Sequence, residues 1–133
     1  LVEFVRAASS SEEEFQQSLT SMHEAIDKAA EKVVKKTPAQ KDLIGQVDAL
    51  IDTLYFTYGS FVLMGVDPER IFDIVHEANM GKIFPDGKAH FDPVTHKILK
   101  PDDWEEKYAP EAAIRKEIQR QVKAYERHKE KQK

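Results

Sequence analysis

The stretch GQVDALIDTLYFTYGSFVLMGVDPERI, residues 45–71, decides the fold. Apolar side chains cover more than one face of a helix that we expect over about residues 39–64, which is typical of a helix at the centre of a bundle or in a subunit interface. Gly65 suits the end of that helix, and Asp67 followed by Pro68 is typical of a helix that starts again. The stretch therefore predicts two helices joined by a tight turn.

Helical spacing continues before and after this stretch. Residues 11–36 carry one apolar stripe behind an acidic N-terminal segment, and Ser11 and Glu14 have the spacing of a capping box. The last helix is expected from about Pro110 to residue 128. It should dock through one narrow apolar row: Ile114, Ile118, Val122 and Tyr125.

The segment from Gly81 to about Asp103 has no helical period, and its glycines and prolines predict a long loop with a small hairpin between Ala89 and Leu99. A loop of this length in a small protein is more often functional than not. The predicted fold class is therefore an all-α bundle with a long, hairpin-containing loop before the C-terminal helix.

Length and composition limit the number of domains and the classes of function that the chain could have. The 133 residues suit a single domain, 1–133, with a core of about 11–110 and a docking helix of about 110–128. A net charge of −4 argues against DNA as a partner. The lack of cysteine excludes a disulfide scaffold and a thiol nucleophile, and it leans toward a cytoplasmic protein. No apolar run reaches the ~18 residues of a membrane span.

Two carboxylates interrupt the apolar helix. Asp48 and Asp52 are four residues apart and so project from one helix face. Two acids this close repel one another, and burying them unpaired is unfavourable. The pair could face solvent, form ion pairs with Lys or Arg, or coordinate a divalent cation such as Mg²⁺ or Mn²⁺. The sequence pattern leaves these three arrangements open.

An ordered set of short motifs extends the pattern. These are Asp48-x-x-x-Asp52-x-x-Tyr55, Tyr58-Gly59, Gly65-Val66-Asp67, VHEANMGK at 75–82, DGK at 86–88 and KP..W at 100–104. In this order they resemble the MazG-like, all-α NTP pyrophosphohydrolases, a superfamily that includes phosphoribosyl-ATP pyrophosphohydrolase. The nearest branch is the one known as "Cof-like phosphohydrolase". The resemblance covers about residues 15 to 110.

The resemblance implies a homo-oligomeric, Mg²⁺-dependent enzyme that acts on nucleoside triphosphates. Such an enzyme splits its substrate between the α and β phosphates and releases a monophosphate and pyrophosphate. The implied metal ligands and catalytic acids are Asp52, Asp48 and Glu24, with Asp27 as a further metal ligand. The implied phosphate-binding residues are Asn79, Lys82, Lys88 and His76.

The first acidic motif of the family is incomplete here. Glu24-x-x-Asp27 has the right spacing. When the helix is aligned by its apolar stripe, however, only Glu24 falls on an acidic position of the motif, and Asp27 is turned away from it. Ala49 also stands where the family has a second acid. A depleted acid cluster is compatible with an alternative function, a non-catalytic module that binds nucleotide or a helical partner.

Overall fold

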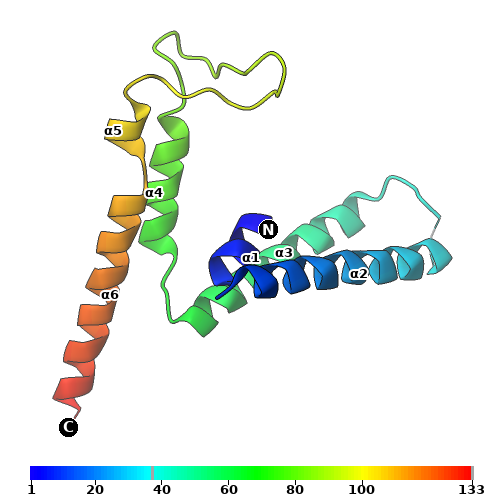
Figure 1. Ribbon diagram of the computed structural model, residues 1–133, viewed down its shortest axis with the longest axis horizontal. Coiled ribbons are helices and arrows are strands. Elements are labelled where there is room, and N and C mark those ends of the chain that lie inside the picture. The colour runs from blue at the N-terminus through cyan, green and yellow to red at the C-terminus, as the bar shows by residue number, and fades with distance from the viewer. Residues whose placement is uncertain (37, 133) are drawn as a thin grey trace. The chain divides into compact units, whose positions relative to one another are not determined.

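The computed structural model describes residues 1–36 and 38–132. Their contacts divide the chain into two compact units, Leu1–Val47 and Asp48–Lys133, and each unit is described by itself. Within the described residues the chain forms six helices (Figure 1), which confirms the all-α class: α1 Val2–Ala8, α2 Glu12–Lys36, α3 Leu43–Met64, α4 Glu69–Met80, α5 Trp104–Tyr108 and α6 Glu111–Lys131. The single domain over residues 1–133 stays a prediction.

The first unit consists of α1 packed on the start of α2, with the first residues of α3. The guanidinium of Arg6 pairs with Glu12 and lies 4.8 Å from the ring centroid of Phe15, so one side chain links the two helices. The predicted capping box is shifted by one residue. Ser11 Oγ accepts the amide of Glu14 as expected, but the Glu14 carboxylate accepts from the amide of Ser10.

The helix expected from residue 39 begins at Leu43 instead. Asp42 explains the later start, because its carboxylate accepts the amide of Ile44 and its carbonyl accepts the amide of Gln46. At the other end of α3, Gly65 has a φ of +67°. The amide of Val66 donates to Phe61 and that of Gly65 to Val62, the bond pattern of a Schellman motif. The predicted helix end is confirmed.

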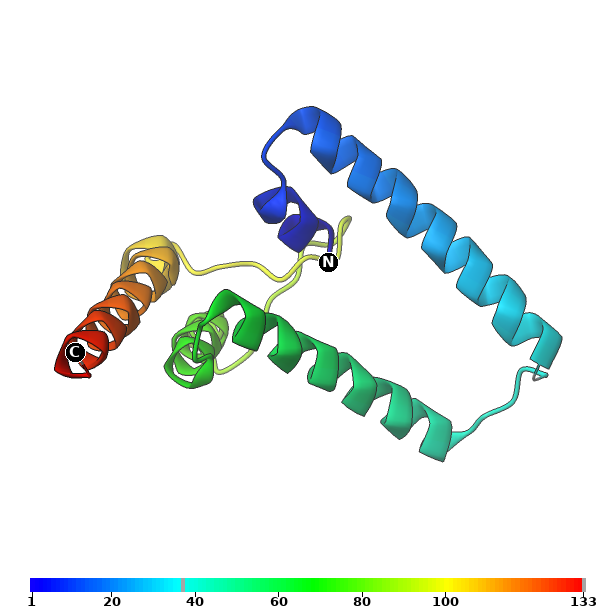
Figure 2. The same ribbon diagram turned by 90° about the horizontal axis from the view of Figure 1, so that it is seen from below.

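The chain turns by 119° between α3 and α4 (Figure 2). The Asp67 carboxylate accepts the amide of Glu69, the first residue of α4, at 3.1 Å. The N-cap position itself is Pro68, one residue later than predicted. No single described helix is both long and apolar enough to cross a membrane, although α3 and α4 satisfy that test when this bent pair is taken together.

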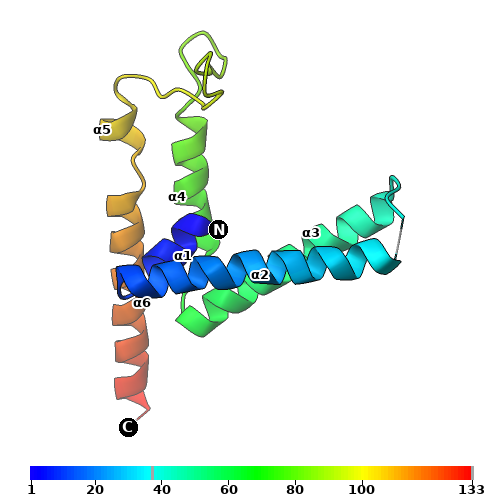
Figure 3. The same ribbon diagram turned by 45° about the vertical axis from the view of Figure 1, so that its right-hand side comes forward.

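In the second unit α4 and α6 lie side by side and run in opposite directions (Figures 1 and 3). Their least exposed residues recur at helical spacing: Ile71, Ile74 and Ala78 on α4, and Ile114, Glu117, Gln121 and Ala124 on α6. The predicted docking row of α6 is therefore wrong beyond Ile114, because Val122 and Tyr125 are 50% and 68% exposed. The helix also extends to Lys131, beyond the predicted end.

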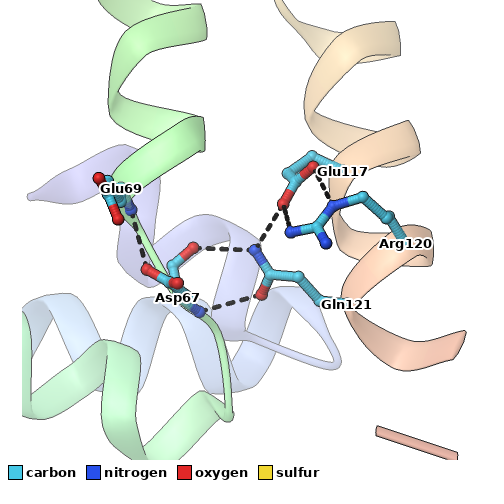
Figure 4. A network of polar contacts seen from close by, with 5 residues as sticks. All are labelled: Asp67, Glu69, Glu117, Arg120 and Gln121. Atoms are coloured by element: carbon cyan, nitrogen blue, oxygen red, sulfur yellow. Dashed lines mark hydrogen bonds and ion pairs between the residues drawn. The ribbon is translucent and has the colours of Figure 1, made fainter. Parts of the chain in front are cut away.

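Hydrogen bonds explain why a polar face of α6 is turned inward (Figure 4). The amide of Gln121 accepts from the backbone N–H of Asp67 at 3.0 Å and donates to its carbonyl at 2.9 Å. The same amide donates to Glu117, which also receives two hydrogen bonds from Arg120. Burying polar groups costs little free energy when each of them has a hydrogen-bond partner. The polar face of α6 can therefore pack against α4 and the turn before it.

The long loop and α5 lie at the upper end of this helix pair in Figure 1. The hairpin between Ala89 and Leu99 is present as backbone hydrogen bonds around one antiparallel bridge, Phe91 with Ile98, and a second bridge joins Ile83 with Ala89. Neither α5 nor α1 was predicted, because helices of five and seven residues are too short to show a period.

The Gln121 clamp predicts a stability effect. We expect Gln121→Ala to lower the free energy of unfolding by about 1–2 kcal/mol, because it removes hydrogen bonds that join α6 to the turn before α4. Urea unfolding followed by circular dichroism measures the change. Gln119→Ala, an exposed position on the same helix, is the matched control. Equal stabilities for the two variants would contradict this role.

The Glu117 carboxylate predicts a pH dependence. Hydrogen bonds from Arg120 and then Gln121 lower the pKa of Glu117 from 4.5 to about 2. Because the folded-state pKa is the lower one, the stabilisation is complete above about pH 4.5 and is lost as the pH falls toward 2. We expect Glu117→Gln to be less stable than the wild type near neutral pH, and the gap to shrink in urea titrations between those two values. A constant gap refutes this assignment.

Candidate functional site

The two predicted acids of the long apolar helix share one face of α3. Asp48 and Asp52 are both exposed. Neither carboxylate forms a hydrogen bond or an ion pair with another residue that the structure describes, whereas many other acids of the chain do. Of the three arrangements considered from the sequence, pairing with a lysine or arginine is thus not seen within the described residues.

The apolar residues that flank these acids are exposed as well. Leu50, Ile51 and Leu54 are 66%, 57% and 52% exposed, and no residue of α3 is buried. Asp48 and Asp52 therefore face solvent, but not on the exposed side of an amphipathic helix with a buried apolar face. The apolar residues of α3 are exposed as well.

The acids of the first motif lie on α2, in the first unit. Glu24 pairs with Lys28 at 3.6 Å, an exposed contact between neighbouring turns that contributes little. Asp27 is exposed. Over residues 1–36 and 38–132, no group of three or more Asp, Glu or His residues is arranged to hold a metal ion. The ligand set of Glu24, Asp27, Asp48 and Asp52 stays a prediction.

Asn79 and Lys82 are brought together at the end of α4. The Lys82 ammonium donates to Asn79 Oδ1 at 2.8 Å, and the backbone N–H of Lys82 donates to the carbonyl of Asn79. The same ammonium lies 5.8 Å from the ring centroid of Trp104. An amide oxygen and an aromatic ring orient this cation without neutralising it, so it remains available to an anion.

Lys88 is presented by a tight turn. Phe84 and Lys88 are joined by a backbone hydrogen bond, and Gly87 takes a φ of +77°. The carboxylate of Asp86 accepts the amide of Lys88 and contacts the ring of His90 at 2.8 Å. The His90 contact lowers the pKa of Asp86. The turn is thus held by its own hydrogen bonds, while the Lys88 side chain is exposed.

His76 is placed apart from these groups. Its ring is parallel to that of Phe72, with centroids 6.3 Å apart, and it is exposed one turn before the end of α4. No hydrogen bond joins His76 to another described residue. A role for His76 in binding phosphate stays a prediction.

Lys100 and Trp104 were not assigned a role from the sequence. The Lys100 ammonium lies 3.8 Å from the ring centroid of Trp104, whose indole N–H donates to the carbonyl of Ala78 at 2.8 Å. Trp104 is only 5% exposed. The sequence signal that could have identified these two residues is the KP..W motif, which contains the single tryptophan of the chain.

An open groove of about 410 Å³ lies at the same end of α4. Its walls include Glu77, Gly81, Asp103 and Tyr108. The ring of Tyr108 lies so close to Gly81 that an added Cβ would come within 2.5 Å of it, which explains the glycine. None of the predicted site residues lines this groove.

Comparisons with known proteins agree with the resemblance. The sequence model of the phosphoribosyl-ATP pyrophosphohydrolase family matches residues 1–79, which include both aspartates of α3, Glu24, Asp27, His76 and Asn79. Lys82, Lys88 and the long loop lie outside the matched segment. A search of curated proteins finds no match.

A solved structure also matches most of the chain. It is the crystal structure of a "putative NTP pyrophosphohydrolase" from Exiguobacterium sp. 255-15, with 39% sequence identity and a TM-score of 0.81. The match covers 94% of this chain and 74% of the other. The chain therefore belongs to the phosphoribosyl-ATP pyrophosphohydrolase family.

Proposed function

We propose that this chain is a Mg²⁺-dependent nucleoside triphosphate pyrophosphohydrolase. It cleaves between the α and β phosphates and yields a nucleoside monophosphate and pyrophosphate. Family membership supports a hydrolase of the nucleotide pyrophosphohydrolase type. The observation that carries the finer proposal is the pair of carboxylates, Asp48 and Asp52, exposed on one face of α3 within the segment that matches the family.

The donor chemistry fits a hard divalent cation. Asp48 and Asp52 offer oxygen ligands, which Mg²⁺ and Mn²⁺ prefer, and Glu24 or Asp27 are the proposed additions. When bound, the cation would neutralise triphosphate charge and make a water molecule more acidic. A carboxylate of α3 would accept the proton of the attacking water as the oxygen of that water bonds to phosphorus. The P–O bond between the α and β phosphates would break in the same step, so that a nucleoside monophosphate and pyrophosphate leave. Lys82, oriented by Asn79, and Lys88 hold phosphate oxygens.

A nucleotide panel with Mg²⁺ or Mn²⁺ tests this activity through the release of pyrophosphate. We expect Asp52→Asn and Asp48→Asn to lose at least about 100-fold in kcat/KM, because each removes a cation ligand. Chelation with EDTA should abolish the activity and added Mg²⁺ should restore it. Glu126→Gln on α6 removes one exposed carboxylate elsewhere and serves as the control.

Two outcomes of this assay contradict the proposal. Folded protein that releases no pyrophosphate across the panel would exclude the activity. Nucleotide binding without turnover, measured by calorimetry on the same preparation, would instead support the alternative of a non-catalytic nucleotide-binding module.

We also propose that the chain acts as a homo-oligomer. Apolar residues are exposed along the length of α3, including Val62 at 78% and Leu63 at 90%. Contiguous apolar surface on this scale is typical of an interaction site, and a second copy offers the same helix. An interface of standard size, about 1,600 Å², would cover it.

Sedimentation velocity at micromolar concentration tests the assembly. We expect the wild type to sediment as a dimer or larger, and Leu54→Glu to shift toward monomer, since it places a charge among apolar neighbours. Lys116→Glu, an exposed change on α6, should not alter the distribution. A wild-type chain that sediments as a stable monomer would refute the proposal.

A further inference from the structure

Two lysines from different segments meet at one aromatic ring. Lys82 follows α4, and Lys100 lies at the end of the long loop. Their ammonium nitrogens are 5.8 Å and 3.8 Å from the ring centroid of Trp104, so they are no farther apart than these two distances added together. The ring itself is fixed, because it is 5% exposed and its N–H donates to the carbonyl of Ala78.

Neither cation is strongly neutralised. Lys82 is hydrogen-bonded to a neutral amide oxygen, that of Asn79. Lys100 is 3.5 Å from the carboxylate of Glu105, whose side chain is 77% exposed, and such solvated pairs contribute little. A cation–π contact orients an ammonium and leaves its positive charge in place.

Three of the four carboxylates of the same loop have partners other than the two lysines. Asp86 accepts from the Lys88 amide and contacts the ring of His90. Asp92 accepts two backbone amides and the hydroxyl of Thr95. Asp103 pairs with Lys107 at 2.6 Å. Each of these three acids has local partners, and none of them forms an ion pair with Lys82 or Lys100 within the described residues, which favours an anion from outside the chain.

We propose that Lys82 and Lys100, arranged on the ring of Trp104, form a binding site for a diphosphate group. Two separated ammonium groups match the two linked phosphates of such a group better than they match a single phosphate. Lys100 is then a second diphosphate contact and Trp104 the residue that positions both cations. The inference rests on the proposed function, in which this site holds the pyrophosphate end of the substrate and then the free product.

The chain contains a single tryptophan, so its fluorescence reports on this site alone. An anion that draws the ammonium groups from the ring changes the surroundings of the indole. We expect inorganic pyrophosphate, titrated at constant ionic strength without a divalent cation, to change the Trp104 emission with saturation. Orthophosphate should bind at least about tenfold more weakly, because it spans only one of the two cations.

Variants test which groups bind the anion. Lys100→Gln and Lys82→Gln should each weaken pyrophosphate binding by about tenfold or more, since each removes one charged hydrogen-bond donor. Lys116→Gln on α6 removes a lysine outside the site and should match the wild type. Calorimetry on all four proteins gives affinities that do not depend on the fluorescence signal. Equal affinities for Lys100→Gln and wild type, or saturable binding with unchanged emission, overturn the proposal.

A further titration compares the two possible sources of a diphosphate group, free pyrophosphate and the β and γ phosphates of a nucleoside triphosphate. A nucleoside triphosphate with a methylene bridge between its α and β phosphorus atoms should give the same emission change as free pyrophosphate, with the same loss in Lys100→Gln. A response to only one of the two ligands overturns the shared site. A protein that binds pyrophosphate at Trp104 but never hydrolyses nucleotides would refute the proposed function and leave the diphosphate site standing.

Discussion

The hydrogen bond from the indole of Trp104 to the carbonyl of Ala78 organises the second unit. Ala78 is itself one of the least exposed residues of the described chain, at 5%, because α6 packs along the same side of α4. The bond fixes the place where the long loop returns to the helices, and α5 and α6 follow directly from it. Through the ring it also sets the positions of Lys82 and Lys100. The packing of the second unit and the proposed diphosphate site therefore depend on the same side chain, Trp104.

Local signals predicted the four longer helices and some of their ends. The end of α3 could be predicted because Gly65 adopts a positive φ that few other residues tolerate, and the start of α4 because the Asp67 carboxylate can reach the next amide. The docking face of α6 could not be predicted. An apolar row is the ordinary sign of a buried face. Here the inner face of α6 is polar, because Gln121 forms hydrogen bonds to Asp67 in the α3–α4 turn and to Glu117 within α6.

The same reasoning separates the predicted site residues. Asn79 and Lys82 are three positions apart at a helix end, so local geometry was enough to bring them together. The partner of Lys82 on its other side, Trp104, is 22 residues further along the chain, and no spacing rule reaches across an irregular loop. The proposed ligand set on α2 and α3 poses the same problem, because periodicity relates residues of one helix and does not place residues of two helices next to one another.

The proposed assembly and the proposed cation act on each other through the aspartates of α3. At the ~6 Å typical of positions four apart on a helix, two carboxylates in water repel by about 0.7 kcal/mol. Covering the apolar sides of α3 in the proposed oligomer would lower the effective dielectric constant to about 20, and the same repulsion would then rise to about 3 kcal/mol. A divalent cation between Asp48 and Asp52 would remove that cost. By linkage, a cation that favours the covered helix would bind more tightly once the helix is covered, so the proposed oligomer and the proposed cation would stabilise one another.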